Sequence, residues 1–176
     1  LYPNWELCIA DGNSRSKTKH VLKEFAGNDN RIKINFLSKN LNISENSNQA
    51  INLASGEYIG LLDHDDELTI DALFEVVKLL QEHPEADLIY SDEDKIDKKG
   101  SRSSFFFKPD WSPDLLLSHN YISHFGVYRK SIIDKIGGFR IGYEGSQDYD
   151  LVIRFTEHTN KIKKIKKILY HWRMIE

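Results

Sequence analysis

Three aspartates lie close together in the segment YIGLLDHDDEL, which spans residues 58–68. Asp63, Asp65 and Asp66 directly follow five mostly apolar residues that are typical of a buried strand. Carboxylates at this spacing repel one another unless a cation lies between them or water separates them. Ligands of open α/β sheets bind outside the carboxyl ends of the strands, where these aspartates would lie. The segment is therefore a candidate cation site at a strand end.

Four interpretations of these acids differ in the residues that they require nearby. The first is structural, with the aspartates as turn and helix-cap residues. The second, a calcium EF-hand, fails because loop positions six and twelve hold Leu68 and Phe74 instead of glycine and glutamate. The third is an aspartyl-phosphate-type phosphatase, which expects threonine or valine where this chain has Glu67.

The fourth interpretation is a nucleotide-sugar site. An Asp-x-Asp pair, here Asp63 and Asp65, would hold Mn²⁺ or Mg²⁺ against the pyrophosphate of the donor. The metal would act as a Lewis acid and neutralise the departing nucleoside diphosphate. The sequence contains no glycine-rich phosphate-binding loop whose amides could replace the metal. The structural, phosphatase and nucleotide-sugar interpretations all stay open on these residues alone.

The elements that must position these residues alternate between strand and helix over the first half of the chain. Alternating or continuous apolar residues predict strands, and apolar residues spaced by three or four predict helices. The predicted strands cover residues 5–10, 31–37, 58–62 and 87–91, and the predicted helices cover residues 16–25, 43–54 and 69–82. This order predicts an α/β domain with a mainly parallel sheet flanked by helices.

The second half is less regular and predicts a smaller mixed region. Residues 92–104 are typical of a polar loop, and the aromatic segment 105–116 predicts a loop with one helical turn. Further strands are predicted over residues 125–128, 162–165 and 168–172, and further helices over residues 130–136 and 147–158. Gly137 and Gly138 should end the first of these helices, and Ser146 should cap the second.

Composition favours one globular domain, because 176 residues and 29 % charged residues are ordinary for this class. A net charge of −3, without RNA-binding aromatic motifs or Cys/His finger spacings, argues against nucleic acid. The single cysteine, Cys8, lies in an apolar run and favours a reducing compartment, which we expect to be the cytoplasm. The basic run KIKKIKK indicates either a solvated strand edge or a contact for the inner face of the plasma membrane or a polyanionic acceptor.

A series of motifs runs through nearly the whole chain. In order, the motifs are ELCIADGNS, NISENSNQAINLASGEYIGLLDHDDEL, YSDEDKID, FKPDWSPDLLLSHNYISH, VYRKSIIDKIGGFR, EGSQDYDLVIR and YHWR. Together they resemble the family-2 glycosyltransferases, which have the Rossmann-like GT-A fold. The subgroup that the chain resembles builds bacterial cell-surface polysaccharide, including rhamnose-containing chains and O-antigen. The first family strand, a VVIPTYN-like stretch, is missing, so we expect a fragment of a longer chain with further domains.

The resemblance implies inverting transfer of a sugar from a UDP- or dTDP-linked donor to a glycan or lipid-linked acceptor, with Mn²⁺ or Mg²⁺ as cofactor. It implies one catalytic domain over residues 1–176. Residues 1–92 would bind the nucleotide sugar, and residues 93–176 would bind the acceptor and carry the catalytic base. The rival function is a nucleotide-sugar-binding module without turnover, suggested by the missing strand and by Gly12, where many relatives have a second aspartate.

On the donor side, the resemblance assigns Asp11 to the nucleotide base and Asp63 to the ribose or the metal. It assigns Asp65 to the metal. His171 matches a metal or pyrophosphate ligand, with a packed core histidine as the alternative. Arg173 would offset the charge of the diphosphate.

On the acceptor side, the resemblance assigns the catalytic base to Asp148 in SQDYDL. One general base is sufficient when an acceptor hydroxyl attacks the anomeric carbon in line with the leaving pyrophosphate. The acceptor contacts that the resemblance implies are Trp111, Gly137, Gly138 and Gln147.

Overall fold

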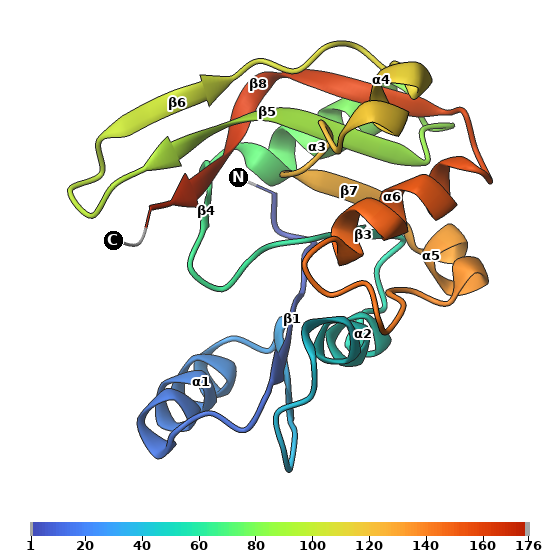
Figure 1. The fold of residues 1–176 in the computed structure, drawn as a ribbon. Helices are drawn as coiled ribbons and strands as arrows, with labels where there is room; N and C mark the ends of the chain where they lie inside the picture. Colours follow the sequence, from blue (N-terminus) through green and yellow to red (C-terminus); the bar gives the residue numbers. More distant parts are fainter. Residues whose placement is uncertain (1, 175–176) are drawn as a thin grey trace.

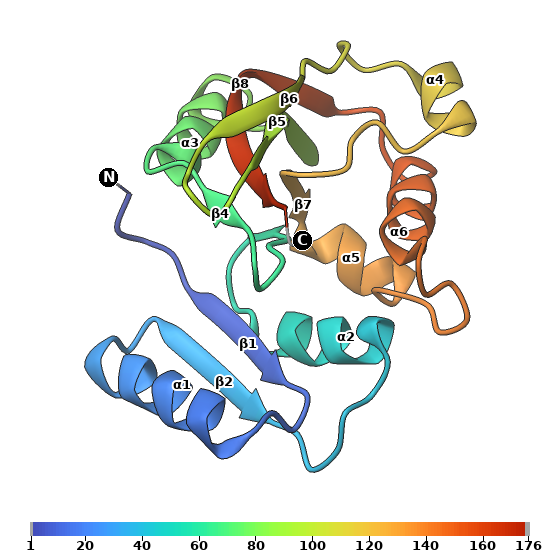
Figure 2. The same cartoon turned by 60° about the vertical axis from the view of Figure 1, so that its left-hand side comes forward.

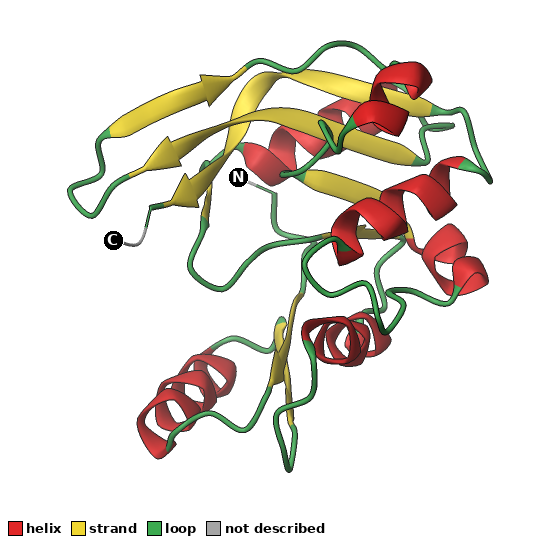
Figure 3. Cartoon of the chain, in the orientation of Figure 1, coloured by secondary structure: helices red, strands yellow, loops and turns green. Residues whose placement is uncertain are grey.

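The computed structural model describes residues 2–174, which form an α/β fold with two sheets (Figures 1 and 3). The smaller sheet consists of β1 (Leu7–Asp11) and β2 (Ile32–Phe36), which are parallel. Helices α1 (Ser16–Asn28) and α2 (Ile43–Leu53) lie against this sheet. The strand and helix order predicted for the first 54 residues is therefore confirmed, with shifts of a few residues at the ends.

The larger sheet has six strands in the order β3–β7–β5–β8–β4, and β6 also pairs with β5. The strands are β3 (Tyr58–Gly60), β4 (Glu67–Leu68), β5 (Leu88–Ile96), β6 (Arg102–Phe106), β7 (Gly126–Arg129) and β8 (Ile162–Arg173). In this sheet β5 and β8 are parallel, and the other described pairs are antiparallel. The α/β class is confirmed, but the sheet is mixed where we predicted a mainly parallel one.

The polar segment that we predicted as a loop after β5 continues this strand and turns back into β6. A short turn can join only antiparallel strands, which is one reason why the sheet is mixed. The strand buries three consecutive acids, Asp92, Glu93 and Asp94. Two of them pair with buried lysines from elsewhere in the chain, Lys164 and Lys108. A local sequence pattern does not contain these distant partners, so the acids resembled a solvated loop.

Helices cover both faces of the larger sheet. Figure 2 shows α3 (Ala72–Glu82) on one side and α4 (Pro113–Ser118), α5 (Lys130–Ile136) and α6 (Gln147–Thr156) on the other. Leu88 and Tyr90 of β5 belong to the hydrophobic cluster that includes α6, whereas Ile89 belongs to the cluster that includes α3. This alternation is expected of a strand buried on both faces. Within residues 2–174, no helix is long and apolar enough to cross a membrane.

The basic run at the start of β8 is largely neutralised by acids. Four of its lysines lie within 4.0 Å of a carboxylate: Lys163 of Glu85, Lys164 of Asp92, Lys166 of Asp110 and Lys167 of Glu75. Their positive charge is therefore shared with partners from the same chain.

The two sheets are not hydrogen-bonded to each other (Figure 2). Within residues 2–174, β1 has a strand partner only in β2, and β3 has one only in β7. A groove of about 970 Å³ is lined by residues around these two strands. Its walls include apolar side chains of α3 and β7, among them Leu73, Val76 and Val127. The groove therefore lies beside backbone edges that no described strand covers.

Glu6, directly before β1, connects the smaller sheet to the loop that precedes β3. Its Oε1 accepts hydrogen bonds from the backbone amides of Ser55 at 2.5 Å and Gly56 at 2.8 Å. Its carboxylate also pairs with Lys33 of β2. Burial raises the pKa of Glu6, but Lys33 and the two amides outweigh this effect and lower the pKa to about 2.

Helix α6 is held in place by Asp150, whose side chain is 6 % exposed. Asp150 pairs with Arg140 and accepts a hydrogen bond from Nε of Arg154 at 2.9 Å. Arg154 also donates to the carbonyl oxygens of Ile136 and Gly138, at 2.9 and 2.6 Å. These contacts connect α6 to the turn after α5, and so they fix the first turn of α6.

Glu6→Gln should lower the free energy of unfolding by about 2 kcal/mol at neutral pH. Because the folded pKa is lower than the unfolded value of 4.5, the contribution of Glu6 is complete above pH 4.5 and is lost as the pH falls toward 2. The difference between wild type and variant should therefore shrink in acid. Urea titrations at neutral and acidic pH measure it, with the exposed Glu24→Gln as control. A difference that is independent of pH would contradict the assignment.

Asp150→Asn should lower the free energy of unfolding by about 2–3 kcal/mol, because Arg154 loses its partner in a largely buried position. The matched control is Asp148→Asn, two residues earlier on the same helix, which should change stability by less than about 0.5 kcal/mol. Urea unfolding of both variants measures the contrast. Equal losses would show that Asp150 does not anchor α6.

Candidate active site

A groove of about 420 Å³ opens beside the carboxyl end of β3. Its lining residues come from β1, α2, β3, the segment 119–125 that precedes β7, and the start of α6. Asp63 and Asp148, predicted for the donor and the acceptor, both line it. The groove thus brings together the acids of the first half of the chain and the predicted base of the second half.

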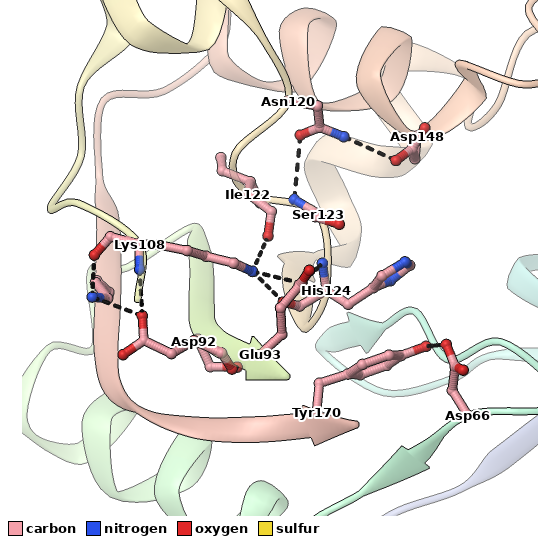
Figure 4. Close-up of polar contacts among 12 residues, drawn as sticks. Asp66, Asp92, Glu93, Lys108, Asn120, Ile122, Ser123, His124, Asp148 and Tyr170 are labelled. Carbon is pink, nitrogen blue, oxygen red and sulfur yellow. Dashed lines mark hydrogen bonds and ion pairs between the residues drawn. The ribbon is translucent and has the colours of Figure 1, made fainter. Parts of the chain in front are cut away.

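An acid cluster, formed by Asp63, Asp66 and His124, lies at this groove. One ligand atom from each residue lies within 4.8 Å of the others. Tyr170 of β8 supports the cluster, since its hydroxyl donates to Oδ2 of Asp66 at 2.5 Å and accepts from the amide of Asp63 at 3.2 Å. Figure 4 shows the ring of His124 beside that of Tyr170, and the ring centroids are 4.6 Å apart. Burial raises the pKa of Tyr170, so its hydroxyl stays protonated and donates.

The donor set of the acid cluster fits a divalent cation. Partial desolvation raises the pKa of Asp63, His124 lowers it, and the charges of Asp66 and Asp65 raise it again. A cation would relieve this repulsion between carboxylates. Carboxylate oxygens suit Mg²⁺ and Mn²⁺, and an imidazole nitrogen is compatible with a transition metal.

Asp65 and His171, both predicted as metal ligands, lie outside the acid cluster. Oδ1 of Asp65 lies 3.8 Å from Nδ1 of the exposed His64. Nδ1 of His171 lies 2.5 Å from Oδ1 of Asp94, where β8 pairs with β5. Neighbouring residues of a strand point to opposite faces of the sheet. Because Tyr170 of β8 points toward the acid cluster, the next residue, His171, points away from it. The alternative prediction for His171, a packed histidine, describes this position.

Arg173 folds back onto the acid loop. Its amide donates to Oδ1 of Asp66, and its Nε donates to the carbonyl oxygen of Asp65, both at 2.7 Å. Its guanidinium also pairs with Glu67. Arg173 therefore contacts the segment that carries the predicted donor-side acids, and its hydrogen bonds stabilise the conformation of that loop.

Asp148 lies in the first turn of α6, as predicted. Its Oδ2 accepts a hydrogen bond from Nδ2 of Asn120 at 2.9 Å (Figure 4). Oδ1 of Asn120 in turn accepts from the amide of Ser123 at 3.3 Å, so the amide group of Asn120 is oriented by its own segment. Sequence reasoning did not select Asn120 or His124. The signal that could have found them is the polar side chains of HNYISHF, residues 119–125, directly before the apolar strand β7.

Three of the four predicted acceptor residues lie around the end of α5 and the start of α6, and Trp111 lies just before α4. Gln147 lines the groove and accepts a hydrogen bond from the amide of Gly145 at 2.6 Å. Gly137 ends α5 with a positive φ of 76°. Gly138 has a positive φ of 67°, and a Cβ atom there would lie 2.4 Å from Oδ1 of Asn48, so a larger residue would be strained and would displace the Asn48 side chain. These two glycines and the partly buried Trp111, which packs against the core, are not among the residues that line the groove.

Asp11 lies at the carboxyl end of β1 and is 6 % exposed. Its carboxylate accepts a hydrogen bond from the amide of Ser14 at 3.2 Å. A Cβ atom at Gly12 would lie 2.4 Å from Oδ1 of the exposed Asn40, so an aspartate here would require this side chain to move. Asp11 is thus held in place without a second acid beside it.

Comparison with known proteins identifies relatives that are longer than this chain. The sequence model of glycosyl transferase family 2 matches residues 1–137. The chain is 38 % identical over 174 residues to the O-antigen biosynthesis protein RfbC of Myxococcus xanthus, a match that covers 98 % of the chain and 14 % of that protein. The chain therefore spans a small part of this curated relative.

Two solved structures share the fold. TarS of S. aureus, residues 1–349 in complex with UDP-GlcNAc, superposes with a TM-score of 0.82 at 18 % identity, over 99 % of this chain and 52 % of that one. The mannosyltransferase PcManGT from Pyrobaculum calidifontis, in complex with GDP-Man and Mn²⁺, superposes with a TM-score of 0.66 at 13 % identity, over 94 % and 47 %. The chain has the fold of GT-A glycosyltransferases, and it covers only part of the family domain. With the family model matching most of its length, the chain belongs to glycosyl transferase family 2.

Proposed function

We propose that the chain is the catalytic part of a metal-dependent, inverting glycosyltransferase that acts in bacterial surface polysaccharide synthesis. The observation that carries the proposal is that Asp63 and Asp148 line one groove. The acid cluster supplies a place for the diphosphate with its cation, and Asp148 supplies a general base. The printed function of RfbC, O-antigen biosynthesis, supports the polysaccharide class, and the proposed location is the cytoplasm.

On the donor side, the proposed substrate is a UDP- or dTDP-linked sugar. UDP-GlcNAc in the complex of TarS and GDP-Man in that of PcManGT support a nucleotide sugar as donor, and only the first supports uridine as its base. Asp11 would contact the base from the end of β1, and Asp63, Asp66 and His124 would hold Mn²⁺ or Mg²⁺. When bound, the ion supplies positive charge that stabilises the departing diphosphate.

On the acceptor side, the proposed substrate is a hydroxyl of a glycan or of a lipid-linked glycan. Asn120 occupies Oδ2 of Asp148, so Oδ1 is left to accept the proton of the hydroxyl. The hydroxyl oxygen forms a bond to the anomeric carbon, while the bond to the diphosphate breaks and its electron pair leaves with the diphosphate. The pKa of a free alcohol is roughly ten units above that of an aspartic acid side chain, so Asp148 cannot take the proton before attack begins. The proton moves late, when the new bond to the anomeric carbon has made the hydroxyl acidic. Attack of the hydroxyl on the face opposite the leaving diphosphate inverts the anomeric carbon, and one base for the hydroxyl proton is sufficient.

Asp148→Asn should lower kcat by about 100-fold or more and leave the affinity for the donor unchanged, because the base acts only in the reaction step. Release of nucleoside diphosphate in the presence of Mn²⁺ and acceptor measures kcat, and calorimetry measures donor affinity. Parental turnover by this variant would contradict the base assignment. Donor binding without turnover by the wild type would favour the binding module, and phosphate release from simple esters would favour the phosphatase.

Asp63→Asn, Asp66→Asn and His124→Gln should each weaken Mn²⁺-dependent donor binding by about tenfold or more, because each removes a ligand of the acid cluster. The matched controls are Asp65→Asn and His171→Gln, because both residues lie outside the acid cluster. Each control should change the Mn²⁺-dependent affinity for the donor by less than about threefold. Calorimetric titration of donor with and without Mn²⁺ tests both sets. If Asp65→Asn abolishes the metal effect and Asp66→Asn does not, the Asp-x-Asp pair holds the metal instead.

The groove of about 970 Å³ beside β1 and β3 is the place that we propose for the missing first strand of the family. Buried backbone groups that lack a partner cost about 1–3 kcal/mol each, so an added strand would stabilise both sheets and the groove between them. The 176-residue chain should bind UDP and dTDP about tenfold or more weakly than a longer polypeptide that includes this strand. Calorimetry on both polypeptides measures the difference. Equal, tight binding by both would show that the groove does not receive a strand.

A further inference from the structure

A buried ion pair lies next to the groove without lining it. The side chain of Lys108 is fully buried, and its Nζ lies 3.0 Å from Oε2 of Glu93, whose side chain is 9 % exposed. A buried ion pair is seldom a net source of stability, because removing both charges from water costs several kcal/mol. Its presence is better explained by directional contacts that an apolar pair could not make.

Those contacts are made with the backbone of the segment 119–125. Nζ of Lys108 donates to the carbonyl oxygens of Ile122, at 2.7 Å, and His124. Oε2 of Glu93 accepts from the amide of His124 at 2.9 Å. The three donors of the ammonium group are therefore all used, one on Glu93 and two on the segment (Figure 4).

The same segment carries one side chain toward each substrate side of the groove. Asn120, near its start, donates to Asp148. His124, near its end, belongs to the acid cluster, and its Nε2 lies 4.0 Å from Oδ2 of Asp63. A shift of the segment would therefore move the partner of the base and a member of the acid cluster together.

We propose that Lys108 and Glu93 are positioning residues, which clamp the segment 119–125 so that Asn120 orients Asp148 while His124 faces Asp63. This inference rests on the proposed function of these groups. The clamp acts through hydrogen bonds to the backbone and touches no substrate. It sets the position of a donor-side and an acceptor-side group with one pair of buried charges.

A second ion pair, on the neighbouring acid of β5, provides a control, because its side chains are only 8 % and 5 % exposed. Lys164 of β8 lies 2.8 Å from Oδ1 of Asp92, which also accepts from the amide of Lys108 at 2.8 Å. Lys164 donates to the carbonyl oxygen of Lys108 as well. No hydrogen bond of Lys164 reaches the segment 119–125 in the described structure, so its removal should cost stability without releasing the clamp.

Hydrogen exchange of the full-length protein tests the clamp independently of activity. Lys108→Met should raise the exchange rates of the amides in residues 119–125 by about tenfold or more. The variant removes the donor to two carbonyl oxygens of the segment, and it leaves Glu93 without its cationic partner. Lys164→Met should change them by less than about threefold. Equal rates in wild type and Lys108→Met, or equal effects of the two variants, would overturn the clamp.

Kinetics of the same protein test whether the clamp acts through Asn120. Lys108→Met and Asn120→Ala should each lower kcat by about tenfold or more, and the double variant should fall less than about threefold below Asn120→Ala alone. Lys164→Met should lower the melting temperature by about as much as Lys108→Met does. Its kcat should nevertheless stay within about threefold of the wild-type value. Multiplicative effects in the double variant, or an equal loss in Lys164→Met, would mean that Lys108 has only a general structural role.

Glu93→Gln replaces Lys108→Met in both experiments if the latter does not fold, since glutamine keeps the volume and one acceptor oxygen. It should raise exchange in residues 119–125 and couple to Asn120→Ala in the same way. A wild-type protein that transfers no sugar from any nucleotide donor would refute the proposed function, while the exchange measurement would still decide the clamp. Unchanged exchange in Glu93→Gln would overturn the clamp even if transfer is observed.

Discussion

Neutralisation of three buried acids in the middle of β5 is the constraint on which the second half of the chain depends. Each acid has a cationic or imidazole partner: Asp92 has Lys164, Glu93 has Lys108, and Asp94 has Arg102 and His171. Removing one partner of a buried pair costs about 3–5 kcal/mol, so strands β6 and β8 and the segment after β6 are held where they can supply these partners. These pairs are compatible only with a strand order that places β6 and β8 beside β5.

The same constraint brings the two sides of the groove together. Strand β8, paired along β5, carries Tyr170 to the acid cluster and Arg173 to the loop before β4. Lys108 and Glu93 hold the segment from which Asn120 donates to Asp148, the proposed base. The proposed donor-side and acceptor-side groups are therefore both positioned through β5, which pairs with β8 and contacts the segment 119–125 through Glu93. Proximity and orientation of this kind are a large part of what an enzyme contributes to a group transfer.

Sequence patterns predicted the parts that local spacing determines. The alternation of strands and helices, the acids at the end of β3 and Asp148 in the first turn of a helix are all local features. Which acid joins the cluster is not local, because Asp66 is selected over Asp65 by contacts with Tyr170 and Arg173, more than a hundred residues away. The continuation of β5 was missed for the same reason, since its acids look solvated until their distant partners are known.

The account assigns the diphosphate to the acid cluster and the proton of the acceptor to one base, Asp148, in the same groove. A single displacement with one base must change the configuration at the anomeric carbon. The most direct test is the proton NMR spectrum of the product formed from a donor of known anomeric configuration. We predict that the new glycosidic bond has the inverted configuration from the first turnover. Retention of the donor's configuration would contradict the account, because attack in line with the leaving diphosphate, from the opposite face, cannot retain it.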